Sequence, residues 1–145
     1  MEESCQIANF ADFCNACGNC DTFCPEYGGP FIRKPQVFGD LHTWQRLKTR
    51  DGFAVSKTAG SCTIHGRIRG EAYVLTRNAS SGDITFSDRS AVVTLTGDPP
   101  VIASASCVVK LADAHRVDTG ILIMMRTLLD GMMDTGHIHP VNARL

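Results

Sequence analysis

The chain of 145 residues is 43% hydrophobic and 20% charged, and its formal net charge is −1. This length and composition predict one globular domain, or a small module with an appendage, and they exclude an intrinsically disordered chain. The longest apolar run covers residues 121–125, far below the roughly 18–20 residues that a membrane helix needs, so we expect no membrane span. The first residues are acidic where a secretory signal would be basic, and we therefore expect a cytoplasmic protein.

The charged residues are segregated along the chain. Residues 1–26 contain five acids and no base, whereas residues 33–69 contain eight bases and two acids. A free electron carrier is typically acidic throughout, because its field then steers it toward basic partners, and this chain does not follow that pattern. The basic stretch contains no recognisable nucleic-acid-binding motif, so we expect no nucleic-acid partner.

Residues 5–10 fit a short strand, and a loop with four closely spaced cysteines follows it. These cysteines have the spacing C-x2-C-x2-C-x3-C-P and are Cys14, Cys17, Cys20 and Cys24, with Pro25 directly after them. Thiolates are the ligands of iron–sulfur clusters, and this spacing is that of the bacterial ferredoxin run. Structural zinc sites usually take two separated cysteine pairs instead. The run therefore predicts a [4Fe–4S] site with these four cysteines as its cofactor-binding and metal-ligating residues.

The cluster that Cys24 ligates stays open at this point. In two-cluster ferredoxins the fourth cysteine of such a run ligates the other cluster, and this chain contains a single run. All four cysteines can surround one cluster at the cost of a strained loop. Alternatively, Cys24 is idle and one of Cys5, Cys62 and Cys107 supplies the fourth ligand. In the third arrangement a partner chain has the matching motif, and the two chains exchange their fourth cysteines.

The remainder of the chain predicts an antiparallel meander with helices. Apolar and polar residues alternate over residues 62–69, where we expect an exposed face made of Thr63, His65, Arg67 and Arg69. Gly28, Gly29, Pro30 and Pro35 predict a loop, and Asp40 is expected to cap a short helix over residues 41–49. An antiparallel meander is expected over residues 53–96. Two helices follow in the prediction, one from Pro99-Pro100 to about His115 and one from Asp118 or Thr119 to about Met133.

These elements predict an α+β fold with two parts. Residues 1–39 form a small ferredoxin-like segment that binds the cluster. Residues 40–145 form an antiparallel β-meander covered by two C-terminal helices, which we expect to serve as a docking region.

The stretch FCNACGNCDTFCPEYGGPFIRKPQVF resembles the carboxy-terminal ferredoxin segment of a family of iron–sulfur flavoproteins described as selenate reductases (YgfK type). These proteins are relatives of the glutamate synthase small subunit and of dihydropyrimidine dehydrogenase. The resemblance is densest over residues 10–38 and continues loosely through residues 52–55, residues 73–75 and the final helices. It implies an electron-transfer role, in which the family's earlier cysteine motif and its flavin- and NAD(P)H-binding domains reside on partner subunits.

The expected function is therefore that of an iron–sulfur electron-transfer subunit of a flavin-containing oxidoreductase complex. The chain contains no Ser/His/Asp or paired-carboxylate arrangement that indicates a catalytic site of its own. The alternative is an assembly or scaffolding subunit with a structural cluster or zinc. His137 and His139 have a spacing that suits a metal, although a polar tail is the simpler interpretation.

Overall fold

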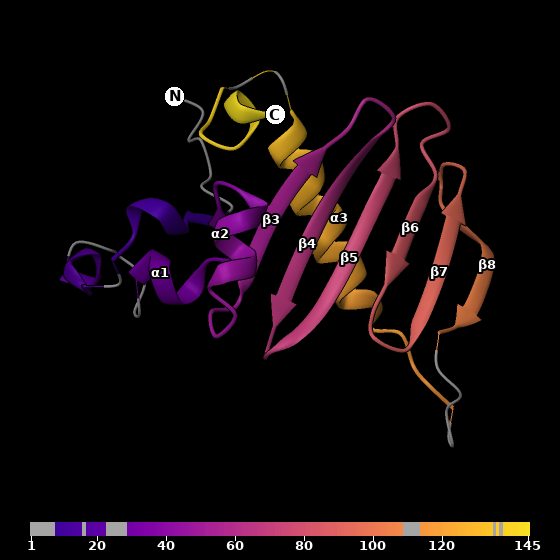
Figure 1. The fold of residues 1–145 in the computed structure, drawn as a ribbon, viewed down its shortest axis with the longest axis horizontal. Helices are drawn as coiled ribbons and strands as arrows, with labels where there is room; N and C mark the ends of the chain where they lie inside the picture. Colours follow the sequence, from indigo (N-terminus) through magenta and orange to yellow (C-terminus); the bar gives the residue numbers. More distant parts are fainter. Residues whose placement is uncertain (1–7, 16, 23–28, 109–113, 135, 137) are drawn as a thin grey trace.

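The structure is a computed structural model that describes residues 8–15, 17–22, 29–108, 114–134, 136 and 138–145. Within this part of the chain the fold is α+β, with an eight-stranded sheet and three α-helices (Figure 1). No helix among the described residues combines the length and the apolar character that crossing a membrane requires.

The strands follow one another across the sheet in chain order. The first three pair in parallel, and every later pair of neighbours is antiparallel, which confirms the predicted meander. Short turns join the antiparallel strands, whereas helices and loops separate the parallel ones. The strands are β1 (Asn9–Phe10), β2 (Gln36–Phe38), β3 (Gly52–Lys57), β4 (Ser61–Ile68), β5 (Glu71–Asn78), β6 (Ile84–Ser87), β7 (Ala91–Thr96) and β8 (Val101–Cys107).

The main core lies between one face of the sheet and α3 (Thr119–Met133), which crosses behind β3, β4 and β5 in Figure 1. Asp118 caps this helix as predicted, because its Oδ1 atom accepts hydrogen bonds at 2.9 and 3.2 Å from the N–H groups of the second and third helical residues. Met125 and Leu129 are buried against the apolar residues of the meander, among them Ile64 and Leu75. The alternating residues of β4 therefore face the core as the sequence predicts.

The opposite face of the sheet is covered at β2 and β3 by α2 (Leu41–Arg46). Trp44 anchors this helix, because it is buried with Phe38 and Ala54 and its indole N–H donates to the carbonyl of Gly52 at 2.9 Å. The predicted cap is confirmed, since Asp40 accepts from the N–H of the third helical residue at 2.7 Å. The helix ends at Arg46, a few residues earlier than the sequence predicts.

The predicted helix from Pro99-Pro100 to about His115 is wrong, because its first part is strand β8. The residues Val101–Cys107 pair antiparallel with β7, with an irregularity of register beside Thr94. Val101 and Ile102 are β-branched, and pairing with β8 satisfies a row of main-chain groups that β7 would otherwise expose. One C-terminal α-helix, α3, covers the described meander instead of the two that we predict from sequence.

Two short elements occupy the stretch that the sequence predicts as a loop. The helix α1 (Gly29–Arg33) has its proline in the first turn, where the missing N–H costs little. Strand β2 follows it and pairs with both β1 and β3. Three residues are too few for an alternating pattern to be recognisable, so only long-range pairing defines this strand. The predicted units 1–39 and 40–145 consequently share one sheet.

Candidate metal centre

The described part of the cysteine run begins where β1 ends, at one edge of the sheet. The chain passes from β1 into the 3-10 helix η1 (Ala11–Phe13), and the N–H of Cys14 then donates to the carbonyl of Ala11 at 3.2 Å. Ala11 is buried, and Asp12 accepts from the main-chain N–H directly after β2 at 3.3 Å. Cys20 lies in a second 3-10 helix, η2 (Asn19–Thr22), which packs against α1. The described part of the run is thus held to the sheet before Cys14 and packs against α1 around Cys20.

The residues between the cysteines shape the loop. Asn15 accepts a hydrogen bond from the N–H of Cys17 at 3.2 Å through its side-chain oxygen. Gly18 has a φ of +79°, and a Cβ atom placed there would meet nothing within 4 Å. Glycine is favoured at this position by the left-handed backbone conformation and not by close packing.

The side chains of Cys14, Cys17 and Cys20 line one hollow of about 450 Å³, which we call the cysteine hollow. Cys14 is half-buried, Cys17 and Cys20 are exposed, and all three are free thiols. The remaining lining residues are aromatic, small or amide-bearing: Asn9, Phe10, Phe13, Asn15, Gly18, Asn19 and Phe31. The structure therefore brings three of the four predicted ligands to one concave site.

The donor chemistry of this hollow fits an iron–sulfur cluster. Among the described residues that line it, the thiols are accompanied by no carboxylate or imidazole, and soft thiolates are the ligands that such clusters take. The thiols are not gathered around a point, since no three His, Cys, Asp or Glu side chains in the described ranges are grouped closely enough to hold one metal ion. The three cysteines thus share a site, and they do not form a closed ligand set.

The four remaining cysteines are distributed differently. Cys5 and Cys24 lie outside the described residues. Cys62, on β4, is half-buried and packs against the main core. Cys107 is exposed on β8, at the edge of the sheet opposite to β1. Neither Cys62 nor Cys107 lines the cysteine hollow, so the structure does not bring them to the predicted site.

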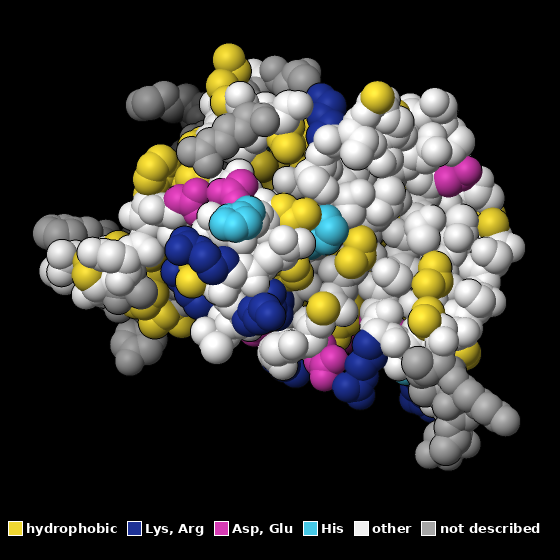
Figure 2. Space-filling view, in the orientation of Figure 1, with side chains coloured by type: hydrophobic (Ala, Val, Ile, Leu, Met, Phe, Trp, Pro, Cys, Tyr) yellow, Lys and Arg dark blue, Asp and Glu magenta, His cyan; other side chains and the backbone are white. Residues whose placement is uncertain are grey.

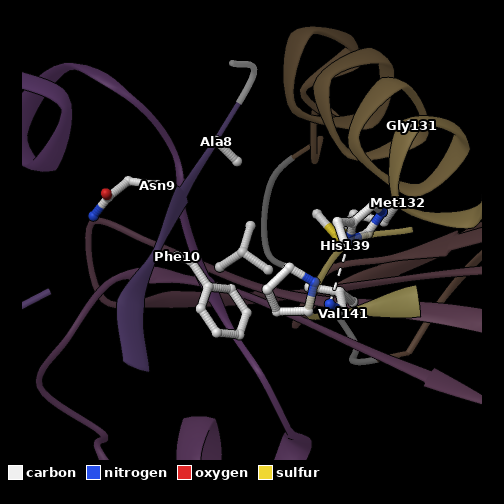
Figure 3. Close-up of a pocket in the computed structure, with 9 residues that line it drawn as sticks. Ala8, Asn9, Phe10, Gly131, Met132, His139 and Val141 are labelled. Atoms are coloured by element: carbon white, nitrogen blue, oxygen red, sulfur yellow. Dashed lines mark hydrogen bonds between the residues drawn. The ribbon is translucent and has the colours of Figure 1, made fainter. Parts of the chain in front are cut away.

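A smaller apolar pocket of about 190 Å³ shares Asn9 and Phe10 with the cysteine hollow (Figure 3). Its other walls come from β2, the end of α3 and the C-terminal segment. His139 is one of its few polar residues, and its Nδ1 atom accepts from the N–H of Val141 at 3.3 Å. His137 lies outside the described residues, so the pair of His137 and His139 stays a prediction.

Two residues that the sequence places on an exposed face are covered by α2. His65 is half-buried with its ring centroid 5.9 Å from that of Trp44, and burial lowers the pKa of its imidazole from the ordinary value of 6.5. Arg67 is 8% exposed and lies over the Trp44 ring at 4.3 Å. The expectation of exposure is therefore wrong for Arg67, and His65 is only partly exposed. The sequence predicts helix α2 itself, but a short helix does not reveal from sequence which strands it covers. The burial of these two residues therefore could not be predicted.

The family resemblance inferred from the residues around Cys14, Cys17 and Cys20 stays a prediction. Comparisons of the chain with family models, with curated proteins and with solved structures found no match.

Proposed function

We propose that this protein is an iron–sulfur electron-transfer subunit of a larger oxidoreductase complex that contains flavin. In this proposal Cys14, Cys17 and Cys20 hold one [4Fe–4S] cluster, which supplies reversible one-electron chemistry when it is bound. The chain acts as a relay and not as an enzyme, because the substrate chemistry belongs to partner subunits. Free thiols that must remain reduced are consistent with a cytoplasmic location.

The position of Cys14, Cys17 and Cys20 along the wall of one hollow is the observation that supports the proposal. The aromatic side chains of Phe10, Phe13 and Phe31 line the same hollow. Apolar walls limit the access of water to a cluster and lower the local dielectric constant, and both influence its reduction potential. Phe13 is 78% exposed, so this wall is also available for contact with another protein.

The fourth ligand defines how the chain works within a complex. Residues 1–39 act in the proposal as a ferredoxin-like segment, in agreement with the family resemblance. Cys24 either completes the cluster of Cys14, Cys17 and Cys20 or ligates a second cluster on a partner subunit that has a complementary cysteine motif. Cys62 and Cys107 do not line the hollow, so these two arrangements are preferred over a fourth ligand from either of them, whereas Cys5 lies outside the described residues and stays an alternative.

Anaerobic reconstitution with iron and sulfide tests the proposal. We expect the chain to bind iron and sulfide in equal amounts and to show a broad visible absorption that dithionite bleaches. The reduced protein should give an electron paramagnetic resonance signal of a one-electron-reduced cluster. Substitution of Cys14, Cys17 or Cys20 by serine should abolish iron retention, whereas Cys62→Ser and Cys107→Ser should preserve it as matched controls.

The same measurements distinguish the alternatives. Cys24→Ser removes iron from the isolated chain if all four cysteines ligate one cluster, and it leaves the iron in place if Cys24 belongs to a partner's cluster. A colourless protein that binds zinc, or iron that persists in the Cys14→Ser, Cys17→Ser and Cys20→Ser triple variant, would contradict the proposal. A cluster that dithionite cannot reduce would instead favour the assembly or scaffolding subunit.

A further inference from the structure

We propose that a basic surface beside the cysteine hollow docks an acidic surface of the partner protein with which the cluster exchanges electrons. This inference rests on the proposed function and identifies the chemistry of its partner. The basic surface is defined by Arg33, Lys34, Arg46, Lys48 and Arg50.

The five basic residues come from segments that the fold brings together. Arg33 ends α1 and Lys34 follows it, whereas the other three lie at the end of α2 and in the loop before β3. Lys34 precedes β2 by two residues and Arg50 precedes β3 by two residues, and these two strands pair in parallel, so both segments lie at the same end of the strand pair. Figure 2 shows Lys and Arg side chains gathered around the position of α2, between the end of the molecule with the cysteine run and the strands.

None of the five basic side chains takes part in the ion pairs found among the described residues. Arg33, Arg46 and Lys48 are exposed. The acids in residues 29–51 are Asp40 and Asp51, and both bind main-chain N–H groups. Asp40 caps α2, and Asp51 accepts from the N–H of Gly70 at 3.0 Å.

The basic surface adjoins the cysteine hollow. Phe31 lines the hollow and lies two residues before Arg33 in the same short helix. The carbonyl of Phe31 accepts from the side-chain N–H of Gln36 at 2.7 Å, which fixes α1 to the start of β2. A partner that covers the basic surface is therefore held beside the cysteine hollow, where the proposed cluster exchanges electrons. The acidic groups of the partner would also steer its approach to this surface.

An acidic protein fits this surface better than a nucleic acid does. The described aromatic residues between Arg33 and Arg50 in the sequence, Phe38 and Trp44, are buried, so neither offers a nucleotide base a ring on which to stack. The position beside the hollow and its exposed Phe13 also suits a protein interface, in which an apolar anchor is bordered by charged groups.

Fluorescence anisotropy of the full chain tests the inference with or without the cluster. The probes are a fluorescein-labelled peptide of alternating acidic and apolar residues and a labelled single-stranded DNA of equal charge. We expect the peptide to bind at low salt and to bind at least as tightly as the DNA. The triple variant Arg33→Glu, Arg46→Glu, Lys48→Glu should weaken peptide binding by at least tenfold.

The control is a triple variant at exposed positions away from this surface, Lys57→Glu, Arg89→Glu, Arg116→Glu, and it changes the net charge by the same amount. Its dissociation constant for the peptide should lie within twofold of the wild-type value. If the first triple variant fails to fold by circular dichroism, the corresponding glutamine variant replaces it. Equal weakening in the control, absence of peptide binding, or DNA binding tenfold tighter than peptide binding would overturn the inference. Because the anisotropy does not require iron, its failure is distinguishable from failure of cluster assembly.

Discussion

Arg67 connects the sheet to the end of α2. Its guanidinium group donates to the carbonyls of Leu47 at 2.9 Å and Arg50 at 2.8 Å, and it lies over the ring of Trp44. The last carbonyls of a helix have no partner within the helix, and the guanidinium group also reaches the carbonyl of Trp44, in the last turn of α2, at 3.4 Å. A buried cation at this end therefore interacts favourably with the helix dipole and binds the loop that follows α2. A residue that resembles a solvent-facing base in the sequence is thus a structural one.

Replacing Arg67 by methionine should therefore destabilise the protein. Methionine keeps most of the apolar packing but removes the donor to the carbonyl of Arg50 and one of the two donors to the carbonyl of Leu47, which also accepts from the N–H of Arg50 at 3.1 Å. We expect the free energy of unfolding to fall by about 2–4 kcal/mol. Urea unfolding followed by the fluorescence of the single tryptophan measures it. Arg69→Met is the matched control, since Arg69 is exposed and should change stability by less than about 0.5 kcal/mol. Equal stability of the two variants would refute this role.

The burial of His65 predicts that the stability of the protein depends on pH. Burial lowers the pKa of His65 in the folded chain from 6.5, so the unfolded chain binds more protons in the window below that value. The contribution of His65 to the free energy of unfolding should therefore be constant above about pH 7. It should decrease as the pH falls through 6.5 toward the pKa of the folded chain. Urea titrations across this window should show a smaller slope for His65→Gln than for the wild type. An identical slope would show that another group causes the dependence.

At the scale of the elements, the packing of α3 on the meander depends on a close approach at Gly66. A Cβ atom at this position on β4 would lie 2.9 Å from Cε1 of Phe53 and 3.2 Å from the terminal methyl of Met125. Phe53 and Met125 are both buried in the main core. The glycine in the alternating sequence of β4 thus makes room for a neighbouring strand and for the helix.

Gly66→Ala should destabilise the protein because the ring of Phe53 is enclosed and cannot move away easily. We expect a loss of about 1–3 kcal/mol, typical of overpacking in a core, measured by thermal or urea unfolding. Gly60→Ala serves as the control, since a Cβ atom there would meet nothing within 4 Å and no positive φ opposes it. If Gly66→Ala proved as stable as Gly60→Ala, the helix would not pack as closely as described.

At the scale of the whole molecule, one sheet joins the cysteine run to the meander. The cysteine hollow lies at the β1 edge, and β8 forms the opposite edge with every residue exposed. Strand β2 links the two regions, because it pairs with β1 on one side and β3 on the other. Phe38 at its end is buried against Trp44 in the smaller core.

A fragment that begins at residue 40 should therefore lose the native environment of Trp44, although the predicted unit boundary lies there. The fragment lacks Phe38, and α2 then has no strand to cover next to β3. We expect a red-shifted tryptophan emission and a lower thermal midpoint than in a fragment that begins at residue 35 and retains β2. Coincident emission spectra of the two fragments would indicate that residues 40–145 fold without β2.

The sequence by itself determined the features that depend on local chemistry and short periodicity. The spacing of Cys14, Cys17 and Cys20 predicts a shared site, the alternation in β4 predicts its core face, and Asp40 and Asp118 predict the starts of α2 and α3. Each signal is contained within a few residues, because capping, turn formation and strand alternation act locally.

Tertiary structure alone decided the features that depend on distant partners. Strand β2 exists because β1 and β3 lie on either side of it, and β8 forms because β7 has an unpaired edge. His65 and Arg67 are covered because α2 packs across strands that follow it in the chain. The basic surface likewise arises from two segments that the sheet brings together. Long-range hydrogen bonding and packing leave no periodic trace in the sequence, so these features could not be predicted from it.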